Sequence, residues 1–430
     1  MENFTNKIQS LLMPLAQKIN NNRYLNAMKD GFLTSMPLLI LGSVFLLFAN
    51  IPINGYSGFM ESLLGSGWSD YFMIPFQTTM EIMTLFVIIG MAKSLARYYS
   101  VDDIGAITLA LVSFLILTPN LLGKDGAFGI PKANLGASGL FLGMLATALA
   151  VEIYRSVLKK GWIIKLPEAV PENVSKSFSS LIPGIFVVLV FMIIRIGFML
   201  TSFNSAQNFI YTVLQTPLLA LGSTLPAQLI AQFTESFLWS LGIHGGNVVG
   251  SVMDPIRMTL MGENAHAFAL GEKLPNIIQY QFGANFISIG GSGTAIGLAI
   301  AGFFFTKSKQ YKALGKLAFI PSLFNISEPL VFGLPIVLNP MLIIPFIITP
   351  LITTVLTYFV MYFNIVPAPN GINIPWTTPP IISGFLVSGW RGSVWQIVLI
   401  VLSTCIYTPF LKILDNKALN EEKEKEIDQA

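Results

Sequence analysis

The residue with the clearest chemical potential is Glu328, a carboxylate in an otherwise apolar segment. It lies between Phe324 and Val331 and is followed by Pro329. Placing a carboxylate in apolar surroundings costs free energy unless the group is solvated or paired, so Glu328 is expected to have a functional role. An ionised carboxylate accepts strong hydrogen bonds, which makes Glu328 a candidate ligand for hydroxyl groups. The alternative is a structural carboxylate that caps backbone amides at the tip of a hairpin.

His244 is the second candidate ligand. It follows Trp239 by five residues and precedes the run Gly245–Asn247, whose two glycines let the backbone bend or approach a ligand closely. A neutral imidazole donates one hydrogen bond and accepts another, which suits a sugar hydroxyl. The alternative is a histidine that only faces water. The other histidine, His266, lies in a polar stretch and is expected to be an ordinary loop residue.

Two tryptophans are candidates for stacking on a sugar ring, because an aromatic face matches the apolar face of a pyranose. Trp376, beside Thr377 in the Asn373–Pro380 run, is the stronger candidate, and Trp239 is the weaker one. Tryptophan is also enriched at both membrane interfaces for unrelated reasons. Trp390 and Trp395 are expected to serve that second purpose.

The glycine-rich run Gly290–Thr294 resembles a phosphate-binding loop only superficially. It lacks the Lys-[Ser/Thr] pair that follows in a P-loop, and no strand precedes it. Close packing of helices by small residues is the expected meaning. Exposed amides beside a ligand are the alternative, with Asn285 as a nearby polar side chain.

The composition requires a membrane around these residues. The chain has 430 residues, of which 53% are hydrophobic and only 11% are charged, and its mean hydropathy is +0.68. Soluble domains carry roughly 25% charged residues. Apolar runs recur, each long enough to cross about 30 Å of hydrocarbon. The sequence therefore predicts a polytopic membrane protein, and its N-terminus shows no pattern of a cleavable signal.

In the first half, five spans are expected at 31–51, 73–95, 103–121, 136–157 and 181–203. Basic residues before the first span and after the second and fourth spans place the N-terminus in the cytoplasm. Interfacial helices are expected over 1–20 and 204–222.

In the second half, weaker spans are expected at 226–243 and 244–262, and clearer ones at 284–305, 340–364 and 394–412. The crossing at 244–262 is inferred because it places the lysines that follow residue 305 in the cytoplasm. With this crossing counted, the charged C-terminal tail also lies in the cytoplasm.

Two further apolar segments are interrupted by proline and polar residues, near 317–339 and 366–389. Proline removes a backbone donor and ends a helix, and freed backbone groups at membrane depth survive only inside protein or a water-filled cavity. Paired, interrupted segments indicate a transport site. We therefore expect an all-α polytopic membrane protein with about ten spans, interfacial amphipathic helices and two re-entrant hairpins, the first entering from the cytoplasm and the second from outside.

The residues absent from the chain narrow the function. No nucleophile with a neighbouring base and no metal-ligating cluster is present, and the one cysteine, Cys405, has apolar neighbours. We expect no cofactor and no metal. The pattern alone predicts a carrier for a polar, uncharged ligand. An ion-coupled secondary transporter is the alternative, with Glu328 as its proton or sodium site; the small set of ionisable residues in the spans argues against it.

The arrangement of these motifs resembles a known family. The N-terminal spans, the Trp239–Asn247 segment, the Asn-Ile-Ser-Glu-Pro hairpin and the Asn-Ile-Pro-Trp-Thr-Thr hairpin resemble the membrane-embedded IIC component of phosphoenolpyruvate-dependent sugar phosphotransferase systems. The resemblance covers essentially the whole chain and is strongest to the lactose, cellobiose and diacetylchitobiose branch.

The resemblance implies a homodimeric permease in the bacterial inner membrane with both termini in the cytoplasm. Residues 1–222 would form the scaffold and dimer interface, residues 223–415 would bind the sugar, and residues 416–430 would be a charged tail. A β-linked disaccharide would be bound by Glu328 and His244 near the hydroxyl to be phosphorylated, with the Trp376 hairpin lining the same pocket. The full set of expected ligands is Glu328, His244, Trp376, Trp239, Asn285, Asn247 and Thr377. Alternating access would present the sugar to a separate IIB protein that carries a phosphocysteine and is itself supplied through IIA.

Overall fold

The computed structural model describes residues 14, 17–18, 21–51, 55–122, 128–167, 170–171, 175, 178–334, 336 and 339–428. Over these residues the regular structure is helical apart from one short antiparallel strand pair, β1 (Leu121–Leu122) with β2 (Phe128–Gly129), and loops connect these elements. Six helical stretches in the described part are long and apolar enough to cross a membrane, or seven if one bent pair is counted as a single span. The predicted fold class, an all-α polytopic membrane protein, is therefore confirmed. The interfacial helix expected over 1–20 falls almost entirely outside the described residues.

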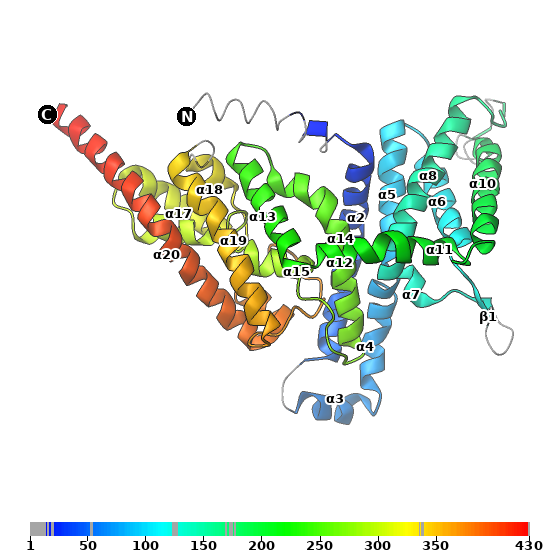
Figure 1. Ribbon diagram of the computed structural model, residues 1–430, viewed down its shortest axis with the longest axis horizontal. Helices are drawn as coiled ribbons and strands as arrows, with labels where there is room; N and C mark the ends of the chain where they lie inside the picture. The colour runs from blue at the N-terminus through cyan, green and yellow to red at the C-terminus, as the bar shows by residue number, and fades with distance from the viewer. Residues whose placement is uncertain are drawn as a thin grey trace. The chain divides into compact units, whose positions relative to one another are not determined.

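The chain divides into two compact units, both drawn in Figure 1. The N-terminal unit comprises Ile19–Leu221 and Asp254–Gly262, and the C-terminal unit comprises Met1–Lys18, Gly222–Met253 and Glu263–Ala430. The expected division after residue 222 lies beside this boundary. The stretch 254–262, in the middle of one helix, belongs with the first unit, and this assignment was not predicted.

The N-terminal unit is built around a close pair of helices, α2 and α5. A Cβ on Gly31 of α2 would lie 2.7 Å from the Val87 carbonyl oxygen, and one on Gly90 of α5 would lie 2.9 Å from the Gly31 Cα. These glycines therefore let the two backbones approach each other, as small residues do in membrane helix pairs.

The elements of this unit are α2 (Arg23–Ala49), α3 (Tyr56–Leu64), α4 (Trp68–Gln77), η1 (Met80–Ile82), α5 (Met83–Tyr99), α6 (Asp103–Leu117), β1, β2, α7 (Lys132–Leu135), η2 (Ala137–Gly139), α8 (Leu140–Lys159), α10 (Leu181–Met199), α11 (Ala206–Phe209), the π-helix η3 (Ile210–Gln215) and α12 (Thr216–Gly222).

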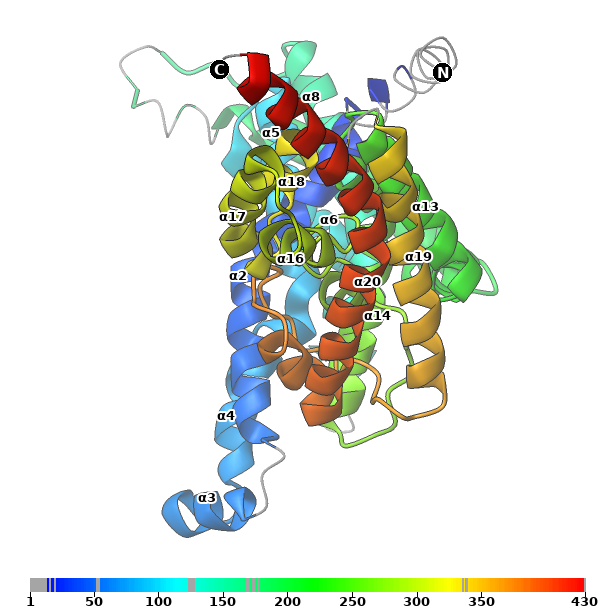
Figure 2. The same ribbon diagram turned by 90° about the vertical axis from the view of Figure 1, so that its left-hand side faces the viewer.

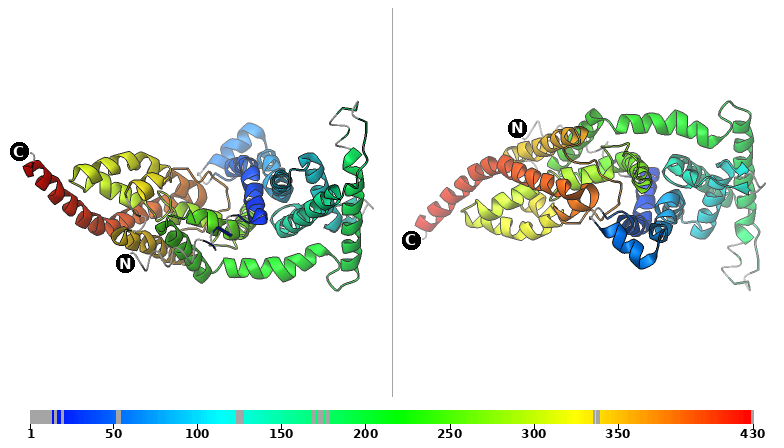
Figure 3. Two further views of the ribbon diagram at one scale, coloured as in Figure 1. Left: turned by 90° about the horizontal axis from the view of Figure 1, so that it is seen from above. Right: turned by 90° about the horizontal axis from the view of Figure 1, so that it is seen from below.

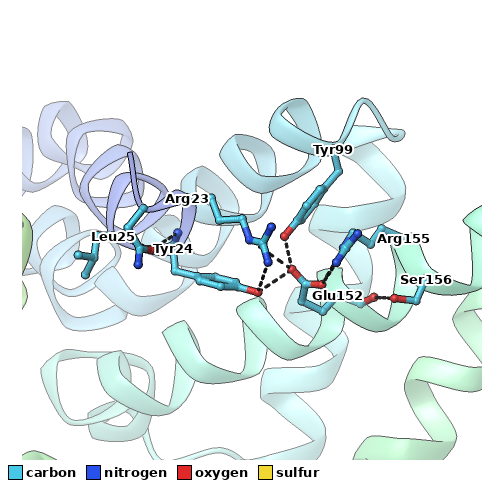
Figure 4. A network of polar contacts seen from close by, with 8 residues as sticks. Arg23, Tyr24, Leu25, Tyr99, Glu152, Arg155 and Ser156 are labelled. Carbon is cyan, nitrogen blue, oxygen red and sulfur yellow. Dashed lines mark hydrogen bonds and ion pairs between the residues drawn. The ribbon is translucent and has the colours of Figure 1, made fainter. Parts of the chain in front are cut away.

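Two charged residues within the helices of this unit, Glu152 and Arg195, have structural partners. The Glu152 carboxylate accepts a hydrogen bond from the Tyr24 hydroxyl at 2.7 Å, another from the Tyr99 hydroxyl, and two from the Arg155 guanidinium at 2.6 Å each (Figure 4). On α10, Arg195 donates to the Ile116 carbonyl near the end of α6. These residues tie helix ends together, which is the role expected of paired ionisable groups at membrane depth.

The C-terminal unit contains the interrupted segments. Figure 2 shows α16, α17 and α18 grouped together, with α19 beside α20. The elements are α13 (Leu225–Ser240), α14 (Gly245–Ala269), α15 (Tyr280–Phe282), the π-helix η4 (Gly283–Ile287), α16 (Ile296–Phe304), α17 (Lys309–Leu323), α18 (Glu328–Gly333), α19 (Pro340–Tyr362) and α20 (Ile382–Asp428).

One expected span in this unit is wrong. The segment 284–305 is not a continuous helix, because η4 ends at Ile287 and α16 begins only at Ile296. Gly290, Gly291 and Gly293 between them have positive φ angles of 79°, 94° and 79°. Such angles are incompatible with a right-handed helix and are readily adopted by glycine. The run Gly290–Thr294 therefore forms a loop inside the unit and does not line a helix–helix contact.

The first interrupted segment forms a helix–break–helix arrangement. Helix α17 ends at Leu323, Asn325 adopts a left-handed conformation with φ 61°, and α18 begins at Glu328 with Pro329 at its second position. Asparagine tolerates this conformation better than most residues, and proline is well placed in a first helical turn. The break thus falls where the Asn-Ile-Ser-Glu-Pro motif predicts it.

The second interrupted segment has one extended limb and one helical limb. Residues 366–381 form no helix, and α20 starts at Ile382. The limbs are joined by Asn370, whose amide N–H donates to the Val387 carbonyl at 2.9 Å and whose side chain donates to the Leu386 carbonyl at 3.0 Å. Helix α20 is then kinked at Ser388 and Gly389. Hydrogen bonds of Asn370 therefore help to hold the loop, where helical hydrogen bonds are absent.

The C-terminal part of α20 is bonded to the start of α17, and both helices lie together in Figure 3. The buried Asp415 carboxylate accepts hydrogen bonds from the Lys307 amide at 2.8 Å, the Ser308 amide at 2.9 Å and the Ser308 hydroxyl at 2.6 Å. Burial raises the pKa of Tyr311 on the same turn, and the carboxylates of Glu421 and Asp415 raise it further. The expected charged tail is thus a continuation of α20 up to Asp428.

Replacing Asp415 with Ala should lower the free energy of unfolding by roughly 3 kcal/mol, because three donors, two of them backbone amides, would lose a charged acceptor. Thermal unfolding in detergent measures the change. Asp415→Asn keeps one acceptor oxygen and should lose less. Equal unfolding temperatures for the wild type and Asp415→Ala would contradict this role of Asp415.

Candidate functional site

The two interrupted segments and the glycine loop meet at one side chain, Asn325. Its Oδ1 accepts a hydrogen bond from the Gly290 amide at 2.8 Å. Its Nδ2 donates to the Trp376 carbonyl at 2.6 Å and to the Thr378 carbonyl at 3.3 Å. Asn325 is itself buried. One amide side chain therefore joins three stretches of chain that are up to 88 residues apart (378 − 290 = 88).

The glycine loop packs directly against the first interrupted segment. The Ser292 amide donates to the Ser327 hydroxyl at 3.2 Å, and a Cβ on Gly291 would lie 2.6 Å from the Ser327 Cβ. A Cβ on Gly293 would lie 2.3 Å from the Phe346 ring. Because the amides of Gly290 and Ser292 already have side-chain acceptors, the loop is not arranged to cradle a phosphate. The expected role of these glycines in helix packing is wrong, because they allow a close backbone approach within a loop.

A second set of buried amides holds the other side of the site. Gln281 Nε2 donates to Asn373 Oδ1 at 2.9 Å, Asn285 donates through Nδ2 to Gln281 Oε1, and Gln396 Nε2 donates to the Asn285 carbonyl at 2.7 Å. All four side chains are at most 1% exposed. The Gln396 Oε1 atom also accepts from the Gly384 amide at 2.9 Å. This network fixes the 366–389 segment to η4 and to α20.

Glu328 lies at the end of the first interrupted segment and is exposed. It is the first residue of α18, one residue after Ser327 and three after Asn325. Among the described residues no group donates a hydrogen bond or ion pair to its carboxylate. The structure therefore gives no support to the capping alternative. A carboxylate at a helix N-terminus is favoured by the helix dipole, and here it remains available to a ligand.

The rings of His244 and Trp239 contact each other in the same unit, tilted by 44°. Their ring centroids are 4.3 Å apart, and the His244 Nδ1 accepts the Asn247 amide at 3.1 Å. With Nδ1 as acceptor, a neutral imidazole carries its proton on Nε2, which makes that atom a donor. Trp239 is buried in the cluster that includes Leu330 and Val331, two and three residues beyond Glu328. The pair therefore packs on the same core as the Glu328 segment.

The remaining expected ligands differ in their access to a solute. Trp376 is 47% exposed and Thr377 is half-buried, so the tip of the second interrupted segment is open. Asn285 is 1% exposed, and no described residue hydrogen-bonds its buried Oδ1. Asn247 is half-buried, and its backbone amide is the group that orients His244.

Comparison with known proteins decides the family. Residues 29–350 match the family model described as phosphotransferase system, EIIC. The chain belongs to the EIIC family. It is 43% identical to the lichenan permease IIC component of Bacillus subtilis (strain 168), over 99% of this chain and 97% of the relative. It is 42% identical to the cellobiose-specific EIIC component of Geobacillus stearothermophilus, over 98% and 97%.

A solved EIIC structure has the same fold. The crystal structure of the transporter ChbC, the IIC component of the N,N'-diacetylchitobiose-specific phosphotransferase system, superposes with a TM-score of 0.93. The two sequences are 42% identical, and the match covers 97% of this chain and 99% of that one. The resemblance proposed from the motifs is thereby confirmed, and the chain is a sugar transport component that works with IIB and IIA proteins.

Sequence reasoning identified the motifs of this EIIC chain but not the residues that hold them together. Asn325 is the first residue of the Asn-Ile-Ser-Glu-Pro motif, but no role was predicted for it. Gln281, Asn373 and Gln396 were not singled out. The available signal was an uncharged amide within an apolar run, as at Gln396, because a buried amide requires partners for both its donor and its acceptor atoms.

Proposed function

We propose that this EIIC protein binds a β-linked disaccharide of the cellobiose or diacetylchitobiose type and carries it across the bacterial inner membrane for phosphorylation by a separate IIB protein. The names of the relatives support this substrate class, since cellobiose and N,N'-diacetylchitobiose are both β-linked disaccharides. The observation on which the proposal rests is the exposed Glu328 carboxylate at the point where two interrupted segments are joined by Asn325.

Each side chain has a proposed role. The Glu328 carboxylate accepts hydrogen bonds from sugar hydroxyls close to the phosphorylated position, and His244 donates one through Nε2. Trp376 stacks on a sugar ring, with Thr377 beside it. Trp239 holds the His244 ring in place and forms the apolar wall behind it. Asn247 orients His244, and Asn285 offers its Oδ1 as an acceptor at the buried end of the site.

The two units have proposed roles as well. The N-terminal unit is the dimer scaffold, and the C-terminal unit carries the sugar and moves against that scaffold by alternating access. The hydrogen bonds donated by the side-chain amides of Asn325, Gln281 and Gln396 support such movement, because they join both interrupted segments into one body. Both chain termini lie in the cytoplasm, in line with the distribution of Lys and Arg. The first interrupted segment is re-entrant from that side and the second from outside.

Equilibrium binding to the detergent-purified protein tests the proposal. Labelled cellobiose and diacetylchitobiose should each bind once per chain, and an unlabelled β-linked disaccharide should displace them, whereas an α-linked disaccharide such as maltose should not. If neither labelled sugar binds to the folded protein, the proposed substrate class is contradicted.

His244→Ala should weaken disaccharide binding about tenfold, the equivalent of about 1.4 kcal/mol and of one neutral hydrogen bond. His266→Ala is the matched control, because this second histidine lies in α14 outside the site and should bind sugar normally. Isothermal titration of both variants measures the difference. Equal affinities for His244→Ala and the wild type would remove His244 from the site.

A further inference from the structure

An open groove in the C-terminal unit lies beside the end of α19 and the kink of α20. Its volume is about 390 Å³, and its lining consists of Ile365, Val366, Trp390, Arg391, Val394 and Trp395. Helices α19 and α20 lie side by side (Figure 2), and both belong to stretches that are long and apolar enough to cross a membrane. The lining residues follow the end of α19 or stand at the start of the span expected at 394–412. The groove therefore lies where two spans reach the edge of the hydrocarbon.

One wall of this groove is apolar and accessible. Ile365 and Val394 are 61% and 50% exposed. Trp395 is half-buried, and its Nε1 donates a hydrogen bond to the Thr357 hydroxyl of α19 at 3.0 Å. Because the polar atom of this indole is already bonded, its ring adds only apolar surface to the groove. An acyl chain matches such a wall, since burying its methylene groups there removes apolar surface from water.

The other wall of the groove offers hydrogen-bond donors and a positive charge. Arg391 is exposed, and its guanidinium carbon lies 5.5 Å from the centroid of the Trp390 ring. The cation–π contact orients the guanidinium without neutralising it. No residue in the described part of the chain forms a hydrogen bond or an ion pair with Arg391, or accepts a hydrogen bond from the Trp390 indole N–H. Two adjacent residues therefore present donors that an anionic ligand can use.

The kink of α20 turns these donors outward. Gly389 has a φ angle of 68°, which interrupts the helix and is readily adopted by glycine. Gly392, in the next turn, is buried against the first part of α20, because a Cβ on it would lie 2.4 Å from the Gly384 carbonyl oxygen. With that side of the turn packed inward, Trp390 and Arg391 are held on the exposed side.

We propose that this groove, which we call the α19–α20 groove, binds an anionic phospholipid. The lipid phosphate accepts hydrogen bonds from the Arg391 guanidinium, whose planar fork matches two phosphate oxygens, and from the Trp390 indole N–H. An acyl chain lies along Ile365, Val394 and the Trp395 ring. A headgroup with a net negative charge is preferred, because the positive charge of Arg391 would repel the ammonium of a zwitterionic headgroup.

The α19–α20 groove is separate from the candidate sugar site. None of the seven expected sugar ligands is among the residues that line it. The groove touches the base of the second interrupted segment, since Val366 both lines the groove and begins that segment. The Asn370 amide, four residues further on, is bonded to the Val387 carbonyl just before the kink of α20. A bound lipid would therefore hold the base of this segment against α20 without contacting the sugar.

The test is a titration of delipidated, full-length protein in a neutral detergent with phosphatidylglycerol that carries bromine on its acyl chains. Bromine quenches tryptophan fluorescence on contact, so Trp390 and Trp395 report a lipid in the groove. The quenching should saturate, and brominated phosphatidylcholine should bind at least about fivefold more weakly. Arg391→Ala should weaken phosphatidylglycerol binding at least about fivefold. Arg391→Lys keeps the charge without the planar fork and should fall between Arg391→Ala and the wild type.

Matched variants confine the signal to the groove. Trp390→Phe with Trp395→Phe should remove most of the saturable quenching, whereas Trp162→Phe should retain it, because Trp162 is an exposed tryptophan of the N-terminal unit. Arg97→Ala removes an exposed arginine near the end of α5 and should bind lipid like the wild type. The unfolding temperature of each variant in detergent reports whether it is folded.

Three results would overturn the lipid site. The first is wild-type lipid affinity in folded Arg391→Ala, and the second is undiminished quenching in Trp390→Phe with Trp395→Phe. The third is displacement of the brominated lipid by a water-soluble ligand: displacement by inorganic phosphate would assign Arg391 to a free anion, and displacement by cellobiose would assign the groove to the sugar. Sugar binding at the candidate site is measured separately, so failure of the lipid site leaves the proposed function standing.

Discussion

Glu328→Gln should weaken disaccharide binding by at least about 100-fold, the equivalent of about 2.7 kcal/mol. A free energy of this size corresponds to weakening one hydrogen bond to a charged acceptor and losing a second one. The substitution keeps the shape of the side chain and removes its negative charge. Because no described residue bonds to this carboxylate, the loss should fall on the ligand and not on the fold. Isothermal titration with cellobiose and diacetylchitobiose gives the affinity, and the unfolding temperature in detergent reports on the fold.

Glu272→Gln is the matched control for this substitution. Glu272 is an exposed carboxylate of the same unit that lies in the turn after α14. Its replacement should leave sugar affinity and unfolding temperature unchanged. Normal binding by Glu328→Gln would exclude Glu328 as a sugar ligand and would return attention to the amide groups of the site.

Asn325→Ala should lower sugar affinity about 30-fold, or about 2 kcal/mol, although Asn325 is buried and is not proposed to touch the sugar. The Gly290 amide and the Trp376 carbonyl would both lose their partner, so the Glu328 and Trp376 segments would no longer be held together. Alanine would also be strained at the observed φ of 61°. Affinity and unfolding temperature should therefore both fall.

Two further variants separate the side chain from the backbone strain. Asn325→Gly tolerates the positive φ and lacks only the amide, so the part of the affinity loss that persists belongs to the hydrogen bonds. Asn325→Asp keeps the acceptor for Gly290 but has no donor for Trp376. The loss of sugar affinity in this variant should measure the contribution of the hydrogen bond from Asn325 to the Trp376 carbonyl. Wild-type affinity in Asn325→Gly would show that the amide does not organise the site.

The features that were predictable from sequence are those set by hydropathy and by proline. Apolar runs gave the helical membrane class, and the position of Pro329 correctly located a helix break beside Glu328. The region 284–305 was mispredicted because glycine, isoleucine and alanine have similar hydropathy in a helix and in a loop. Positive φ angles, such as those at Gly290, Gly291 and Gly293, distinguish the two, and hydropathy does not report them.

The organisation of the site was less predictable, because it depends on pairs of residues far apart in the sequence. Asn325 bonds to Gly290 and Trp376, and Gln396 bonds to the Asn285 carbonyl 111 residues away. Nothing local to either partner specifies such a bond. The candidate ligands Glu328, His244 and Trp376 were found because each is an unusual residue type for its apolar surroundings, which is a local signal.

Phosphorylation-coupled sugar transport is measured most directly in vesicles that contain the purified protein, with phosphorylated IIB inside and labelled cellobiose outside. Sugar phosphate should accumulate inside, its amount should follow the supply of phosphorylated IIB, and an ionophore should have no effect. Accumulation of free cellobiose that collapses when the ionophore is added would contradict this coupling and would favour an ion-coupled carrier with Glu328 as the ion site.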